Sequence, residues 1–341
     1  MTVTIGRREL LAAFGGAAVA WPLAGRAQQS AMPVIGVVSG QSSDTEARNT
    51  AAFRKALNEN GYIEGENVTV QYHWVEGQYD RLPVLMADLV RRRVAVIATT
   101  GSVPAALAAK AATATIPIVF GAGDDPVKLG LVASFARPGG NATGINFLNL
   151  EVTAKRLRLL HELVPKAVRI AVLVNPANAT SAESTLRAVQ EAAPAIGLQT
   201  QVLNATTIGE IDAAFATLAR ERPDALFVAG DAFFVSRAVQ FATLTARDRI
   251  PATYSLRDYV KAGGLTSYGT DLADVSRQIG VYTGRILKGA KPADLPVVQS
   301  TKFEFVINAN GQSTQPRSPS ATTRHRGRGD RIKPREWEGS K

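Results

Sequence analysis

Residues 34–41 read Val-Ile-Gly-Val-Val-Ser-Gly-Gln, an apolar stretch followed at once by a small polar turn. A closely similar unit returns at residues 169–176, which read Arg-Ile-Ala-Val-Leu-Val-Asn-Pro. Continuous runs of Val, Ile and Leu are typical of strands that are covered on both faces of a parallel sheet. The sequence therefore indicates that the chain consists of two similar halves.

The similarity between the two halves continues in step along the chain. In the first half, the strands expected after residues 34–38 lie at 68–74, 94–98 and 115–121, and the helices at 46–60, 79–92 and 103–112. In the second half, the corresponding strands lie at 198–203, 225–229 and 249–255, and the helices at 181–196, 208–222 and 236–247. Strands that alternate with helices predict an α/β fold, with two similar Rossmann-like lobes that each contain a parallel sheet. We expect a cleft between the lobes.

Three further segments are expected to cross between the lobes and to form a three-stranded hinge, at residues 145–148, 263–269 and 302–308. A helix is predicted at 272–287, after the repeat is complete. The expected first lobe is 28–145 plus 270–301, and the expected second lobe is 146–269 plus 302–310.

Residues 1–27 have the pattern of a signal peptide. Arg7 and Arg8 precede an apolar run of small residues at 12–23, and Ala27 ends a small-residue cleavage site. The run is shorter than the roughly 20 apolar residues that span a bilayer. Paired arginines fit the twin-arginine route, but ordinary secretory signals also carry them, so both routes stay open. We expect an exported, periplasmic protein.

Charge and cysteine content exclude several classes of protein. The formal net charge is +10, but residues 1–27 carry three Arg and one Glu, and residues 309–341 carry eight Lys or Arg and three acids. Without these ends, the net charge of the body of the chain is only +3, so its charge does not indicate a nucleic-acid-binding protein. The chain has no cysteine, which excludes a disulfide framework, a thiolate metal site and a cysteine nucleophile.

Polar loops follow the strands of the first half, and open parallel sheets present ligands at these carboxyl ends. The candidate ligand-binding residues there are Ser39, Gln41, Thr100, Ser102, Gly121 and Asp124. Thr100 and Ser102 precede the helix at 103–112, where hydroxyl groups and free backbone N–H groups could hold a carboxylate. The alternative is that Ser102 only caps this helix.

The second half supplies its own candidates, Asn175, Asp231, Phe233 and Tyr254, and the crossing segment adds Phe147. Asp231 and the phenylalanines beside it could hold an ammonium group and an apolar side chain. The alternative is that Asp231 caps the helix from Ser236 and that the rings belong to the core. Three basic residues on the helix at 150–163 are interpreted as a solvated face, namely Lys155, Arg156 and Arg158.

Several segments together resemble the exported substrate-binding proteins of one ABC-transporter family. They are the signal with Arg7, Arg8 and residues 26–29, then 175–176, 231–234, 250–252 with Tyr254, 262–265, 267–269, 302–304 and 306–308. The resemblance implies a type I periplasmic-binding-protein fold that closes on a small molecule and delivers it to a membrane permease. Members with assigned ligands include binders of aromatic amino acids.

The resemblance to type I amino-acid binders also implies roles for particular residues. Thr100 and Ser102 would take a carboxylate, the loop at 121–124 would help to orient it, and Asp231 would meet an amine. We expect a monomer with no cofactor and no metal site. The ligand itself is not fixed by the pattern.

Two other classes of function remain as alternatives. A ligand sensor that presents to a membrane receptor would use the same fold, and the fold cannot choose between transport and sensing. A two-lobed enzyme is the other alternative, but the chain lacks a Gly-x-Ser-x-Gly elbow, a phosphate loop ending in Lys and a histidine pair. Asp124 and Asp125 could bind a cation or act as a base, although a loop cap before Pro126 also fits. We therefore expect a protein that is not an enzyme.

The tail at 311–341 departs from the family pattern, which has a short closing helix rich in Ala and Leu. Here the residues are mostly Ser, Thr, Arg and Gly, a composition that predicts a disordered basic tail. We interpret the tail as the product of a frameshift near Asn310, because codon degeneracy allows family-like Ala- and Leu-containing sequence in a neighbouring frame.

Overall fold

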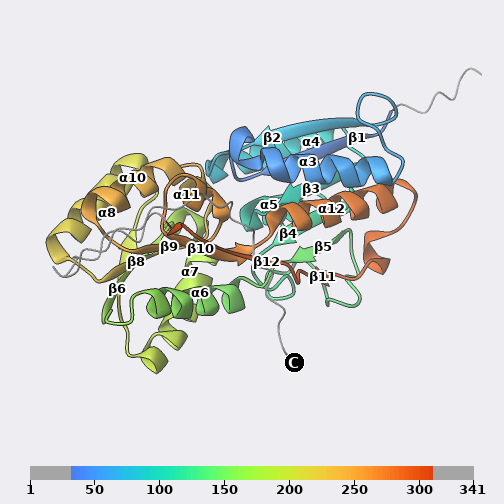
Figure 1. The fold of residues 1–341 in the computed structure, drawn as a ribbon. Helices are drawn as coiled ribbons and strands as arrows, with labels where there is room; N and C mark the ends of the chain where they lie inside the picture. Colours follow the sequence, from blue (N-terminus) through green and yellow to red (C-terminus); the bar gives the residue numbers. More distant parts are fainter. Residues whose placement is uncertain (1–31, 310–341) are drawn as a thin grey trace, which may run out of the picture.

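The first of two α/β lobes is built on a parallel six-stranded sheet with the strand order β11-β5-β4-β3-β1-β2. The structure is a computed structural model that describes residues 32–309 (Figure 1). The strands are β1 (Val34–Ser39), β2 (Thr69–Trp74), β3 (Val96–Thr100), β4 (Ile118–Ala122), β5 (Ala142–Asn146) and β11 (Val298–Gln299).

The second lobe repeats this topology, with the strand order β12-β10-β9-β8-β6-β7. Its strands are β6 (Arg169–Val174), β7 (Gln199–Asn204), β8 (Ala225–Val228), β9 (Ala252–Tyr254), β10 (Thr266–Thr270) and β12 (Phe303–Ile307). Only β12 runs antiparallel to its neighbour in the described part of this sheet. The repeat of one strand order confirms the predicted fold class of two similar lobes with largely parallel sheets.

Helices cover both faces of each sheet, which explains the unbroken apolar sequence of the central strands. In the first lobe, α4 (Leu82–Arg91) and α5 (Val103–Ala112) pack on one face, and α3 (Ser43–Glu59) and α12 (Leu272–Leu287) on the other. In the second lobe, α8 (Ile208–Glu221), α9 (Ala232–Val235), α10 (Ala238–Asp248) and α11 (Arg257–Lys261) face α6 (Asn149–Leu163) and α7 (Ala179–Ala192) across the sheet.

Short 3-10 turns complete the described structure. They explain why several helix boundaries differ from those predicted from the sequence. They are η1 (Tyr79–Arg81), η2 (Pro176–Asn178), η3 (Pro194–Ile196) and η4 (Pro292–Asp294). The predicted helix at 79–92 therefore begins as a 3-10 turn, and the predicted helix at 181–196 ends in one. The helix expected from Ser236 begins two residues later, because the backbone of Arg237 is not helical, and a separate short helix precedes it at 232–235.

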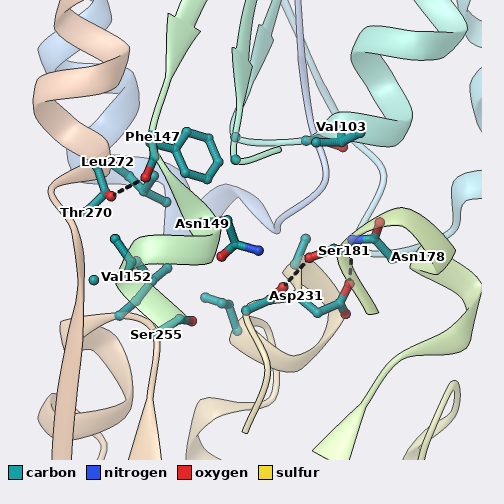
Figure 2. Close-up of a pocket in the computed structure, with 18 of the residues that line it drawn as sticks. Val103, Phe147, Asn149, Val152, Asn178, Ser181, Asp231, Ser255, Thr270 and Leu272 are labelled. Atoms are coloured by element: carbon teal, nitrogen blue, oxygen red, sulfur yellow. Dashed lines mark hydrogen bonds between the residues drawn. The ribbon is translucent and has the colours of Figure 1, made fainter. Parts of the chain in front are cut away.

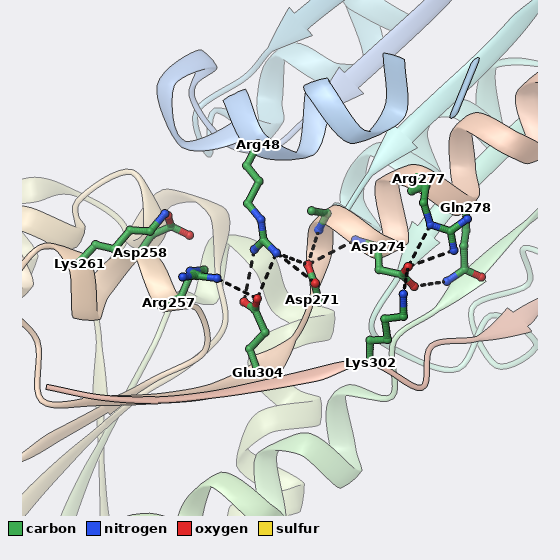
Figure 3. A network of polar contacts seen from close by, with 11 residues as sticks. Arg48, Arg257, Asp258, Lys261, Asp271, Asp274, Arg277, Gln278, Lys302 and Glu304 are labelled. Atoms are coloured by element: carbon green, nitrogen blue, oxygen red, sulfur yellow. Dashed lines mark hydrogen bonds and ion pairs between the residues drawn. The ribbon is translucent and has the colours of Figure 1, made fainter. Parts of the chain in front are cut away.

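The chain passes between the two sheets three times, after β5, after β10 and after β11. The Thr270 hydroxyl donates to the Phe147 carbonyl at 3.0 Å and so ties two of these passages together. Glu304 on β12 accepts from Arg48 of α3 at 3.1 Å and from Arg257 of α11 at 3.0 Å (Figure 3). These ions are partly exposed, so each pair adds little stability, but together they orient the hinge.

Within residues 32–309 we find no helix that combines the length and the apolar character needed to cross a membrane. The predicted signal peptide at 1–27 and the predicted tail at 311–341, with its frameshift, lie outside the described residues.

Candidate functional site

A cavity lies between the lobes, where the carboxyl ends of the strands of both sheets meet (Figure 2). Its empty volume is about 750 Å³ when the space at its open mouth is included. In Figure 2, Phe147, Thr270 and Leu272 lie on one side, and Asn178, Ser181 and Asp231 lie on another. Polar groups and apolar side chains line it together, as in sites for small molecules.

The structure brings five of the predicted site residues to the wall of this cavity. They are Gln41, Ser102, Asp124, Phe147 and Asp231. Ser39, Thr100 and Gly121 lie directly behind the wall at the ends of β1, β3 and β4, and Asn175 holds Asp231. Phe233 is packed in the core of the second lobe, and Tyr254 is fully buried there with its ring stacked on Tyr259 at 4.4 Å. Neither of these two aromatic residues is part of the cavity wall.

Ser102 caps α5, which is one of the two roles that the sequence left open, and it also lines the cavity. Its hydroxyl oxygen accepts a hydrogen bond from the Ala105 backbone N–H at 3.3 Å, so it caps the helix. The residues at the helix start, Gly101, Ser102 and Val103, also line the cavity. The positive end of the helix dipole and the backbone N–H groups of its first turn favour an anion at this position.

Asp124, which follows β4, is a buried acid close to donors of the second lobe. The residue is 91% buried, and its Oδ1 atom has no hydrogen-bond donor among the described residues. Burial raises the pKa of this carboxyl, although the Ser184 hydroxyl, Arg187 and Asn149 oppose the shift. The neighbouring Asp125 instead accepts from the backbone N–H groups of Val127 and Lys128, which agrees with a loop cap.

Both carboxylate oxygens of Asp231 accept hydrogen bonds from other groups of the protein. Oδ1 accepts from the side chain of Asn175 at 2.9 Å and from the backbone N–H groups of Phe233 and Phe234 at 3.0 and 3.3 Å. Oδ2 accepts from Asn178 at 3.1 Å and from the Tyr79 hydroxyl at 3.0 Å. The carboxylate therefore caps α9, a helix that begins four residues before the one expected from Ser236. Because Tyr79 belongs to the first lobe, the carboxylate also joins the two lobes.

Two glycines of the first lobe allow this close approach. A Cβ atom at Gly77 would lie 2.5 Å from the Cβ atom of Phe233, and one at Gly40 would lie 2.9 Å from the Cβ atom of Ala232. Both contacts are with α9 of the second lobe. The lobes are therefore closed on each other in this structure.

Arg156 lies where the sequence analysis did not expect it. The interpretation of a solvated basic face is correct for Lys155 and Arg158, which are exposed, but wrong for Arg156, which is 1% exposed and lines the cavity. The helical period supplies the reason. Arg156 lies on the face of α6 that also buries Val152, Thr153, Leu157 and Leu160.

Glu46 of α3 is a further buried ionisable group, on the first-lobe side. Burial raises the pKa of its carboxyl to about 7, while Asn49 and the hydroxyls of Ser39 and Thr100 oppose the shift and Asp258 of the second lobe adds to it. The side chain is 2% exposed.

We expect Glu46→Gln to flatten the pH dependence of stability. The unfolded carboxyl ionises near pH 4.5, whereas the folded one stays protonated until about pH 7. The wild-type free energy of unfolding should therefore fall by about 3 kcal/mol as pH rises from 4.5 through 7. Urea unfolding at pH 5 and pH 8 would measure this. An equal fall in the variant and the wild type would contradict the assignment.

Other wall residues were not singled out from the sequence, including Tyr79, Asn149, Asn178 and Ser181. Asn178 had a signal, since it belongs to the polar loop after β6. Nothing in the sequence marked Tyr79 as a site residue, because a tyrosine at the start of a helix is as common in a hydrophobic core as in a binding site. Among residues 32–309 no cluster of three or more His, Asp or Glu residues could hold a metal ion.

Two Rossmann-like lobes, three connections and a closed cavity between them define a two-lobed binding protein with the type I periplasmic-binding-protein fold. A family model described as ABC transporter substrate binding protein matches residues 32–315. The chain belongs to this family.

Three relatives show what the chain is similar to. A tyrosine-binding protein of Clostridioides difficile (strain R20291) is 28% identical over 257 residues, which are 75% of this chain and 73% of the relative. The structure of the ABC domain in complex with L-Trp from Streptococcus pneumonia is 25% identical, with a TM-score of 0.74, and the match covers 82% of this chain and 93% of that one. The ligand-free, open structure of a substrate binding protein with adhesive properties from Clostridium difficile has the same identity and coverage but a TM-score of 0.58. The chain therefore superposes less well on the structure described as ligand-free and open than on the L-Trp complex.

Proposed function

We propose that this protein captures an amino-acid-like carboxylate in the interlobe cavity and delivers it to the permease of an ABC importer. The observation that carries the proposal is that the start of α5 and Asp124, whose buried Oδ1 atom has no hydrogen-bond donor within residues 32–309, line the same cavity. One attracts an anion and the other a cation, and an amino acid carries both. The relatives whose names state binding of tyrosine and a complex with L-Trp support this ligand class.

In the proposed complex, the ligand carboxylate lies at Gly101, Ser102 and Val103, where it accepts hydrogen bonds from the start of α5. The ligand amine donates to Asp124, because the oxygens of Asp231 already accept five hydrogen bonds within the protein. A role for Asp231 in amine binding stays a prediction. The apolar wall at Phe147, Val235 and Leu256 then surrounds the ligand side chain.

Ligand capture in this proposal is a movement of the lobes about the three connecting segments. The ligand binds the first lobe while the lobes are apart, and the second lobe adds contacts only when they close. Differential affinity for the closed form is what shifts the population towards closure. The predicted signal peptide supports export to the periplasm, where such a protein meets its permease. The family relationship supports a role in binding rather than in catalysis.

The test is the double variant Thr100→Ala, Ser102→Ala, titrated calorimetrically with L-tyrosine and L-tryptophan. We expect affinity to fall by about tenfold or more, since hydrogen bonds to a charged group contribute about 1.5–3 kcal/mol. Thr207→Ala is the matched control, because it removes a helix-capping hydroxyl at α8, far from the cavity. Unchanged affinity in the double variant would remove the carboxylate site from the first lobe.

A further inference from the structure

Arg156 is a fully buried cation that faces a ligand cavity. It stands on α6, the helix that enters the second lobe directly from the hinge. The guanidinium lies over the ring of Phe227, with its central carbon 4.2 Å from the ring centre, and Nη2 donates to the Val228 carbonyl at 3.3 Å. These two contacts fix its position without neutralising its charge.

No carboxylate within the described residues pairs with this charge. The Nε atom of Arg156 is buried without a hydrogen-bond partner in residues 32–309, and so is the hydroxyl of Tyr259, a group close enough to interact with the guanidinium electrostatically. Burial lowers the pKa of Arg156 to about 9, so the group remains a cation at neutral pH. A buried cation that no anion accompanies is costly, and such groups in proteins are normally paired.

Arg156 is part of the cavity wall. Asn149, Val152 and Arg156 lie three and four residues apart, on one face of α6, and all three line the cavity. In Figure 2, Asn149 and Val152 lie across the cavity from Val103, at the start of α5. The cavity therefore has an anion-attracting group in each lobe, with Asp124 as its acidic group on the first-lobe side.

We propose that Arg156 selects ligands with a second anionic group, a carboxylate at the end of the side chain remote from the amino-acid carboxylate. This inference rests on the proposed function and names its substrate class as acidic amino acids and related dicarboxylates. The planar guanidinium can donate two parallel hydrogen bonds to a carboxylate, a geometry that a neutral side chain cannot satisfy. The distal carboxylate supplies the ion-pair partner that Arg156 lacks within residues 32–309.

Matched ligand pairs test the proposal, because their members differ only in the distal group. One pair is L-phenylalanine and 4-carboxy-L-phenylalanine, and the other is L-norleucine and L-2-aminoadipate. We expect the wild type to bind the acidic member of at least one pair about tenfold more tightly or better, as for other desolvated charge pairs. Arg156→Met should lose that preference and change the affinity for the neutral member by less than about threefold. Arg158→Met, an exposed arginine on the same helix, should behave as the wild type.

Three outcomes would overturn the inference. The first is equal affinity of the wild type for both members of each pair, and the second is a preference that survives in Arg156→Met. The third is a loss of affinity for both members alike in Arg156→Met, which is the result of a purely structural arginine. The comparison of the two members of each pair in the wild type needs no variant, so it tests the inference even if Arg156→Met fails to fold. Binding of the neutral members alone would overturn this inference and leave the proposed function standing, whereas no binding of any amino acid or carboxylate would overturn both.

Discussion

Gly77→Ala is expected to weaken ligand binding by more than about tenfold while the protein still unfolds cooperatively. The added methyl group would meet the Cβ atom of Phe233 at 2.5 Å when the lobes are closed. Because Phe233 and Gly77 belong to different lobes, the clash is relieved when the lobes separate. Closed and open states differ by only a few kcal/mol, so a clash of this kind is enough to favour the open state.

Gly65→Ala is the control for Gly77→Ala. Both glycines have left-handed backbones, with φ of +84° at Gly65 and +80° at Gly77, but a Cβ atom at Gly65 would meet nothing within 4 Å. Both variants should therefore lose about 1 kcal/mol of stability from backbone strain. Calorimetric titration and small-angle scattering of the ligand-bound proteins would separate the two effects. Equal affinities in the two variants would show that the Gly77 contact does not limit closure.

Asp231→Ala is expected to cost about 2–4 kcal/mol of stability, because it leaves buried donors without an acceptor. The donors are the side-chain amides of Asn175 and Asn178 and the backbone N–H groups of Phe233 and Phe234. All of them belong to the second lobe. Urea unfolding would measure the loss, and a variant as stable as the wild type would contradict the hydrogen-bond pattern.

Tyr79→Phe isolates the part of this arrangement that joins the lobes. It removes the hydrogen bond of 3.0 Å from the Tyr79 hydroxyl to Asp231, together with the contacts of this hydroxyl with the Ala232 backbone and the Asn178 side chain, and leaves every bond within the second lobe in place. We expect stability to change by less than about 1 kcal/mol and affinity to fall several-fold, as for the loss of one hydrogen bond. If affinity were unchanged, the Tyr79 contact would not contribute to closure.

Much of the fold could be predicted because the same strand pattern occurs twice. The unbroken apolar sequence of the strands near residues 34 and 169 indicates that these strands are buried on both faces of a sheet. The repeat then predicts which strands and helices follow each of them. Boundaries were less accurate where short turns intervene, as between α9 and α10. The two-residue strand β11 and the five-residue helix α11 are too short to produce a periodic signal.

The cavity wall could be predicted only in part, because a loop position does not say which way a side chain points. Ser102 and Asp124 follow strands and reach the cavity, but Phe233, which follows β8, belongs to the core. Asp231 was expected either to contribute to a pocket or to cap the helix from Ser236; it lines the cavity and caps α9, not the later helix. Arg156 was misinterpreted because its exposed neighbours Lys155 and Arg158 suggested a solvated face, although the spacing of Val152 and Leu160 places it on the buried side.

The most direct test of capture of an amino-acid-like carboxylate is a thermal-shift screen of residues 28–341, the chain without its predicted signal. The panel contains neutral, aromatic and acidic amino acids, simple carboxylates, sugars, nucleosides and divalent metals. A ligand that binds only the folded protein raises the melting temperature by mass action. We expect a rise that depends on ligand concentration with amino acids that carry a free carboxylate, and none with uncharged sugars. A rise confined to sugars, nucleosides or metals would contradict the proposed function.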